Sequence, residues 1–223
     1  MGELTSILTE TTNRLLQSYV TREQQYLCEA GEWPETLWQA LEENGLTQPL
    51  VPESQGGVGA MWQDTFVIAF AAGRWQAAVP LVETIIASWL LSKVGIKVPS
   101  GPLTLIDDGH QLHMDGATIS GTAHAVPWGQ RASHVVATID TGNQHHVVLI
   151  PTSKISYTPD LSMAREPRDH LDVTNVTIQS ARLNDSTDIS YIKRAGALMR
   201  SAQIAGAMQA AIKMTVDYAT ERE

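Results

Sequence analysis

The hydrophobic pattern of the chain changes its period twice, and this change constrains the fold more than any other feature. Up to about residue 97, apolar residues recur at the three- and four-residue spacing of helices. From about 101 to 183, short β-prone runs alternate with turn residues. A helical pattern returns at about 187. The sequence therefore predicts three consecutive units: an all-helical domain at 1–97, a β domain at 98–185, and one long helix at 186–223.

The middle unit carries the β content of the predicted α+β class. Its runs are short, and no helical segment separates them, which favours a small β-barrel or sandwich. The clearest turns are Asp108-Gly109, Asp115-Gly116 and Thr141-Gly142-Asn143. The six expected strands are "LTLI", "QLHM", "ATISGT", "SHVVATI", "HHVVLI" and "VTNVTI".

The last helix has small residues along one side. A helix of about 35 residues is much longer than usual, and small side chains let another helix approach closely. Because a single helix cannot bury such a face alone, we expect it to need a bundle that this chain does not contain. No capping glycine, asparagine or proline follows its last residues, "YATERE". The small residues are Ala195, Ala202, Ala205, Gly206 and Ala210.

Composition excludes several classes of function. A formal net charge of −9 argues against nucleic-acid binding, which requires a basic face. The single cysteine, Cys28, permits no internal disulfide, is expected to be a passive thiol, and indicates a reducing compartment. No apolar run reaches the roughly 18 residues of a membrane span. Glu3 and Glu10 precede any basic residue, unlike a signal or transit peptide, so we expect a cytoplasmic protein.

The glycines of Gly56-Gly57-Val58-Gly59 do not form a dinucleotide-binding motif. If Gly57 is the first glycine of G-x-G-x-x-G, the last position falls on Trp62, and the segment lies between helices rather than after a strand. A tight loop with positive φ angles is the expected structure.

Histidines do not predict a metal site either. His110 and His113, and the neighbours His145 and His146, are separated by odd numbers of residues. Odd offsets on a strand point to opposite faces, so neither pair can chelate from one strand. No metal is therefore expected.

Four segments together resemble motifs of the acyl-CoA dehydrogenase family. "PESQGGVG" resembles the family's P-E-x-x-G-G-x-G loop, and "PLVET" resembles a segment of divergent members. "GTAHAVPWGQRAS" lies in the register of the middle-domain motif G-T-K-x-W-I-T-N-A-x-x-A-D. "YATERE" matches the start of Y-A-x-x-R-x-Q-F-G. The motifs occur in the family's order and span the chain.

The resemblance implies a fold and a reaction. The family has an N-terminal helical domain, a middle β domain and a C-terminal four-helix domain, of which residues 186–223 would be the first helix. Its members use FAD to convert an acyl-CoA to the 2,3-enoyl-CoA, in fatty acid metabolism among other pathways. The catalytic glutamate lies in later helices, so we assign no catalytic residue and expect residues 1–223 alone to be inactive.

The implied flavin site departs from the family pattern. Ala125, Val126 and Pro127 stand where most members have an aromatic residue, an aliphatic residue and a threonine that bonds the flavin. Pro127 offers neither a hydroxyl nor an N–H group. Trp128 either covers the flavin ring or packs in the core. Asp107 is the sole remnant of the family's acidic Gly-Ser loop.

Two arginines and the expected partners complete the implied site. The family often has an aspartate and an arginine near the thioester end of CoA; Arg194 and Ala197 stand at those positions here, so that contact is lost or rebuilt. Arg222 aligns with an arginine that reaches the FAD of a neighbouring subunit. Arg222 is otherwise a solvated residue at the helix end. Oligomers through the C-terminal helices and an electron-transferring flavoprotein are the implied partners. Two hypotheses stay open: a flavin-dependent acyl-CoA dehydrogenase, or a flavin-poor, non-catalytic subunit paired with an active homologue.

Overall fold

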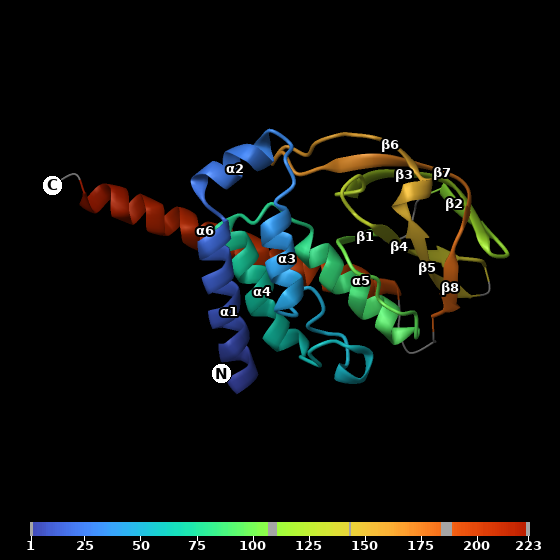
Figure 1. Cartoon of the computed structure of the whole chain (residues 1–223), viewed down its shortest axis with the longest axis horizontal. Helices are drawn as coiled ribbons and strands as arrows, with labels where there is room; N and C mark the ends of the chain where they lie inside the picture. Colours follow the sequence, from blue (N-terminus) through green and yellow to red (C-terminus); the bar gives the residue numbers. More distant parts are fainter. Residues whose placement is uncertain (1, 107–110, 143, 184–188, 222–223) are drawn as a thin grey trace.

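The computed structural model of the chain describes residues 2–106, 111–142, 144–183 and 189–221 (Figure 1). Five helices form the first part of the chain; α1 packs against α3 and α4, and α5 leads from the helices to the strands (Figure 1). The predicted α+β class is confirmed. The helices are α1 (Glu3–Tyr19), α2 (Arg22–Glu29), α3 (Glu35–Glu43), α4 (Trp62–Trp75) and α5 (Leu81–Lys93).

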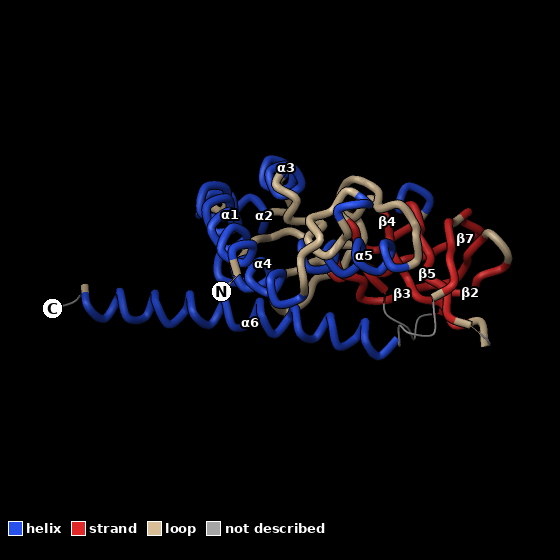
Figure 2. The backbone as a smooth tube through the Cα atoms, turned by 90° about the horizontal axis from the view of Figure 1, so that it is seen from below, coloured by secondary structure: helices blue, strands red, loops and turns tan. Residues whose placement is uncertain are grey.

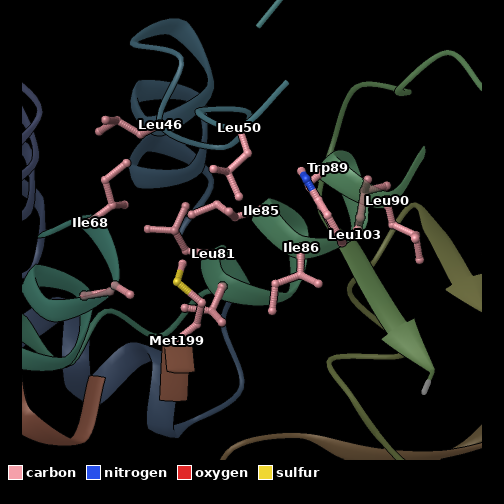
Figure 3. Close-up of a cluster of buried hydrophobic side chains, with 14 of the residues drawn as sticks. Leu46, Leu50, Ile68, Leu81, Ile85, Ile86, Trp89, Leu90, Leu103 and Met199 are labelled. Atoms are coloured by element: carbon pink, nitrogen blue, oxygen red, sulfur yellow. The ribbon is translucent and has the colours of Figure 1, made fainter. Parts of the chain in front are cut away.

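Helix α5 joins the helices to the strands. Every residue from Leu81 to Ser92 is buried, as expected for a helix that is apolar on all sides. In Figure 3 its side chains point toward Ile68 of α4, toward Met199 of the last helix and toward Leu103 of the first strand. These residues belong to one continuous hydrophobic core. The fold therefore has no solvent layer between the helical part and the nearer sheet.

The strands form two four-stranded sheets rather than a closed barrel. The first has the order β1-β4-β5-β8, in which β1 and β4 are parallel, and the second has the order β2-β3-β7-β6. A second core lies between them. Six strands were predicted, and the residues that the structure describes contain eight. They are β1 (Leu103–Ile106), β2 (Gln111–Asp115), β3 (Thr118–Pro127), β4 (His134–Asp140), β5 (His145–Pro151), β6 (Ser156–Thr158), β7 (Arg168–Thr177) and β8 (Gln179–Arg182).

Strand β3 is irregular where it approaches the helices. Its pairing with β7 shifts register between Ile119 and Gly121, and again between Ala123 and Val126. Gly121 has φ +131°, and a Cβ atom there would lie 1.7 Å from the carbonyl oxygen of Gln111. Such shifts are β-bulges, which redirect side chains at the end of a strand. The second one sets the direction of the residues up to Pro127.

The last helix, α6 (Ile189–Thr220), has two halves in different environments. Its first half packs chiefly against α4, and also against α5. The backbones approach so closely that a Cβ atom on Gly206 would lie 2.0 Å from the carbonyl oxygen of Phe70. Residues 211–220 are all exposed, and this half projects beyond the other helices (Figures 1 and 2). The buried face consists of Ile192, Ala195, Met199, Ala202 and Gly206.

This packing corrects one expectation. The small-residue face was expected to need helices that this chain does not contain. In the structure, Ala195, Ala202 and Gly206 of this face are buried against other parts of the same chain. The expectation fails because α4 carries a complementary glycine, Gly73, whose Cβ atom would lie 1.9 Å from the carbonyl oxygen of Gln203. In the second half, Ile212, Met214, Val216 and Tyr218 are exposed.

The glycine-rich loop is the tight loop that the sequence predicts. Gly56 and Gly59 have φ angles of +90° and +70°, and a Cβ atom on Gly57 would lie 2.2 Å from the carbonyl oxygen of Val51. Within the described residues, no helix is long and apolar enough to cross a membrane.

Candidate functional site

A cavity of about 370 Å³ lies where the three parts of the chain meet. Its walls come from α5, from strands β1, β3 and β7, and from the first half of α6; we call it the α5–α6 cavity. The larger apolar side chains of its lining are Val82, Ile86, Leu105, Ile106, Val126, Pro127 and Ile192. Its ionisable residues are Glu83, His124, Arg168, Lys193 and Arg200.

An ion-pair chain crosses the cavity wall. The Arg200 guanidinium donates to the carboxylate of Glu83 on α5, and its Nη1 lies 3.4 Å from Oε1 of Glu166. Glu166 in turn accepts from Nη2 of Arg168 at 2.9 Å. The Glu83 side chain is only 8 % exposed. Burial raises the pKa of Glu83, and the positive charge of Arg200 opposes that rise.

Two histidines meet at the edge of the cavity. Nδ1 of His124 on β3 lies 3.2 Å from Nδ1 of His170 on β7, and the N–H of Ala125 donates to the same His170 nitrogen at 3.4 Å. His170 Nδ1 is therefore the acceptor, and His124 Nδ1 carries the proton. The remaining His170 nitrogen, Nε2, lies 3.5 Å from Asp160 Oδ2.

A second, larger cavity of about 760 Å³ lies beyond Arg200. It is bounded by the connection between α2 and α3, by the segment 159–169 and by α6. Arg200 lines both cavities, so its ion pairs form part of the partition between them. Trp128 lines the second cavity and packs edge-on against Trp33, with ring centroids 6.5 Å apart.

The residues predicted from the family motifs fall in different places. Val126 and Pro127 line the α5–α6 cavity, whereas Trp128 faces the second cavity and is 8 % exposed. Arg194 is exposed and bonds Ser190 on its own helix; its neighbours Lys193 and Ala197 line the cavity instead. Both Arg222 and Asp107 lie outside the described residues. The roles proposed for all of these residues stay predictions.

Sequence reasoning missed the ion-pair chain. Glu83 carried a usable signal, because it is the only charged residue in the otherwise uncharged run from Leu81 to Ser92. A lone charge inside such a helix must be paired when the helix is buried. Arg200 carried a similar signal, because it is the only charged residue between Arg194 and Lys213, whereas Arg168 stands among other polar residues.

No metal centre is found in the part of the chain that the structure describes: no three His, Cys, Asp or Glu side chains come together as ligands. Burial lowers the pKa of His134 on β4, but this residue lines neither cavity.

The cavity lining suits the apolar faces of a flavin ring better than it suits the polar edge of that ring. Leu105, Ile106 and Val126 offer an apolar wall on the side of the strands. At the end of β3, however, Pro127 has no N–H, and its carbonyl already accepts from the hydroxyl of Thr104. The N–H of Trp128 donates to the carbonyl of Pro167 at 3.2 Å. This stretch of β3 therefore has little hydrogen-bonding capacity left for a flavin.

Comparison with known proteins identifies the class to which this architecture belongs. The sequence profile of the acyl-CoA dehydrogenase N-terminal domain matches residues 3–97. Acyl-CoA dehydrogenase FadE27 of Mycobacterium tuberculosis is 23 % identical over 215 residues, which cover 84 % of this chain and 56 % of that protein. The chain thus spans little more than half the length of this relative.

Solved structures share the fold over the whole chain, including α6. The Tcur3481–Tcur3483 steroid ACAD variant superimposes with a TM-score of 0.85 at 22 % identity and is covered over 68 % of its length. The ChsE4–ChsE5 complex from Mycobacterium tuberculosis superimposes with a TM-score of 0.82 at 21 % identity, and 68 % of the matched chain is covered. A glutaryl-CoA dehydrogenase from Mycobacterium smegmatis, in complex with FADH2, superimposes with a TM-score of 0.80 at 13 % identity, and 67 % of its chain is covered.

The helical domain, β-sandwich and long helix are therefore those of the acyl-CoA dehydrogenase fold. The match of residues 3–97, the similarity to FadE27 and the fold shared along the whole chain together support a divergent member of the acyl-CoA dehydrogenase family. The burial of the small-residue face of α6 within the chain does not count against this assignment, because these structures match the whole chain, α6 included.

Proposed function

We propose that the protein is a flavin-dependent acyl-CoA dehydrogenase and that the acyl thioester reacts in the α5–α6 cavity. The observation that carries this proposal is the position of the cavity. It lies between helices α5 and α6 on one side and strands β1 and β3 on the other. Its lining includes Val126 and Pro127, where the family motif predicts the flavin. The cavity size is also within the roughly 300–1,000 Å³ of small-molecule sites.

The reaction removes two hydrogens from neighbouring carbons of the acyl group. FAD held beside Val126 and Pro127 would supply the acceptor for a hydride from Cβ, a base would take the proton from Cα, and the product would be the 2,3-enoyl-CoA. The apolar residues Val82, Ile86 and Ile192 would hold the acyl group and exclude water. An electron-transferring flavoprotein is the proposed electron acceptor.

The base is proposed to come from outside the described residues. Glu83 is committed to Arg200, and Glu166 to both Arg200 and Arg168. Carboxylate oxygens that already accept hydrogen bonds from guanidinium groups are not free to approach Cα of the substrate. We accordingly expect no turnover from residues 1–223 alone.

A spectrum of the purified protein tests this proposal. The protein should be expressed with whatever further C-terminal helices its gene encodes. A visible flavin band that bleaches when an acyl-CoA is added, with formation of the enoyl-CoA, is the expected result. A protein that binds neither flavin nor any acyl-CoA would contradict the proposal.

A second candidate function is a partner subunit with little chemistry of its own. It is favoured by the end of β3, where Pro127 lacks an N–H and that of Trp128 is occupied. One of the structural relatives, ChsE4–ChsE5, is a complex of two components. The exposed second half of α6 is the proposed contact surface in either case. A protein that is colourless alone and gains flavin only when co-expressed with a homologue would select this candidate.

A further inference from the structure

The ion pair between Glu83 and Arg200 is out of place in a cavity for a plain hydrocarbon chain. Glu83 lies between Val82 and Thr84 in a helix whose residues are all buried from Leu81 to Ser92. Buried ion pairs rarely add stability, and well-packed apolar residues often replace them without loss. Stability alone therefore gives no reason for a charged pair in this wall, which suggests that the pair serves the ligand.

The guanidinium groups offer more donors than the surrounding protein accepts. Arg200 has five N–H groups, of which Nη1 and Nη2 bond Glu83, Glu166 and Gln203. Arg168 bonds Glu166 and the carbonyl of Pro167, again through Nη1 and Nη2. Neither Nε has an acceptor among the residues that the structure describes. A hydrocarbon filling the cavity would displace water from these donors and leave them unsatisfied.

The charges narrow the chemistry of a ligand group that could satisfy the donors. Two carboxylates, Glu83 and Glu166, already balance the guanidinium groups of Arg168 and Arg200. A ligand carboxylate bound to Arg200 would lie close to Glu83, which lines the same cavity, and would be repelled by it. An uncharged acceptor oxygen satisfies the donors without this repulsion.

We infer that the α5–α6 cavity selects acyl groups that carry a keto or hydroxyl oxygen, and that Arg200, held by Glu83, is the residue that recognises this oxygen. The inference rests on the proposed function, because it takes the cavity to be the acyl site. Ile86 and Ile192 contact the hydrocarbon part of the chain, and Arg200 binds the oxygen.

Three CoA thioesters with acyl chains of equal length test the inference by calorimetric titration. These are hexanoyl-CoA, 5-oxohexanoyl-CoA and adipoyl-CoA, titrated into the wild-type protein. One added hydrogen bond to a charged donor predicts roughly tenfold tighter binding of 5-oxohexanoyl-CoA than of hexanoyl-CoA. Adipoyl-CoA is expected to bind more weakly than the oxo compound.

Variants assign the preference to the ion pair. Glu83→Leu with Arg200→Met replaces both partners by apolar side chains, and the preference for the oxo compound should disappear while hexanoyl-CoA still binds. Lys213→Met, on the exposed half of α6, should keep the wild-type preference. Circular dichroism reports whether the double variant folds, and the comparison of thioesters on the wild type is decisive without it.

Each contrary outcome has a distinct meaning. Equal binding of hexanoyl-CoA and 5-oxohexanoyl-CoA overturns the inference and leaves the proposed function standing, since Arg200 would then bind nothing specific to the oxo group. Tightest binding of adipoyl-CoA overturns the argument for an uncharged oxygen. Absence of binding by all three thioesters overturns the inference and the proposed function together.

Discussion

The close contact between α4 and α6 predicts opposite effects for one substitution at two positions of the same helix. A Cβ atom on Gly206 would lie 2.0 Å from the carbonyl oxygen of Phe70, and 2.8 Å from the backbone nitrogen of Arg74. These are backbone atoms and cannot rotate away. At Gly196, ten residues earlier, nothing lies within 4 Å of such an atom. Gly206→Ala should therefore destabilise the protein, and Gly196→Ala should stabilise it.

The magnitudes follow from two opposing terms. Alanine is favoured over glycine in a helix interior by about 0.8–1.0 kcal/mol. At Gly196 this gain stands alone. At Gly206 it is opposed by overpacking, which costs about 1–3 kcal/mol in a well-packed core, and the contact with backbone places the cost in the upper part of that range. A net loss of about 1–2 kcal/mol is expected for Gly206→Ala, so the two variants should differ by about 2–3 kcal/mol.

Urea unfolding followed by circular dichroism measures this difference. With a slope of about 2–3 kcal/mol per molar urea, the unfolding midpoints of the two variants should differ by about 1 M. Equal slopes would show that the variants unfold from the same compact state. If Gly206→Ala is as stable as the wild type, or as stable as Gly196→Ala, the result would contradict the close contact between the backbones of α4 and α6.

Three further predictions concern the cavity. Arg200→Met alone should lower the free energy of unfolding by about 3–5 kcal/mol, because it leaves a buried carboxylate unpaired, and adding Glu83→Leu should restore most of the loss in the same urea assay. The pKa of Glu83 is raised in the folded state above its ordinary value of 4.5. Its contribution to stability is therefore largest below pH 4.5 and is lost as the pH rises through the folded pKa. Glu83→Gln should remove this part of the pH dependence of unfolding, and an unchanged pH profile would refute the prediction. Pro127→Thr should tighten FAD binding by about 2- to 10-fold through one added hydrogen bond, measured by quenching of flavin fluorescence; no change would show that β3 does not meet the flavin edge.

The order of helices and strands could be predicted because each has a strong local signal. The helical period, the entry of α5 after Pro80 and the exit at Gly95 fix α5 from sequence alone. Strands β6 and β8 were missed because they are three and four residues long and largely exposed, so no alternation of apolar residues marks them. The sequence does not indicate which helix packs against the small-residue face of α6, because small residues allow the close approach of many different helices.

The candidate site was only partly predictable. The position of Val126 and Pro127 came from a family resemblance, and both line the α5–α6 cavity. Arg194 and Trp128 came from the same resemblance, and their roles stay predictions. On α6 the helix turns by about 100° per residue, so a shift of one position changes which side chain faces the cavity. Trp128 directly follows strand β3, where its φ angle is +56° and its ring packs against Trp33. The pairing of Glu83 with Arg200 joins residues 117 positions apart, and no local pattern specifies such a contact.

The central claim is that the acyl group of a CoA thioester occupies the α5–α6 cavity, and Gly196 allows a direct test. Leucine at this position has room for its Cβ atom and extends into the cavity that Gly196 lines. Titration of 5-oxohexanoyl-CoA into the Gly196→Leu variant should show at least about tenfold weaker binding than the wild type, by loss of the cavity volume. Ala211→Leu, at an exposed position of the same helix, is the matched control and should bind as the wild type does. Unchanged affinity of a folded Gly196→Leu variant would place the thioester elsewhere and contradict the account.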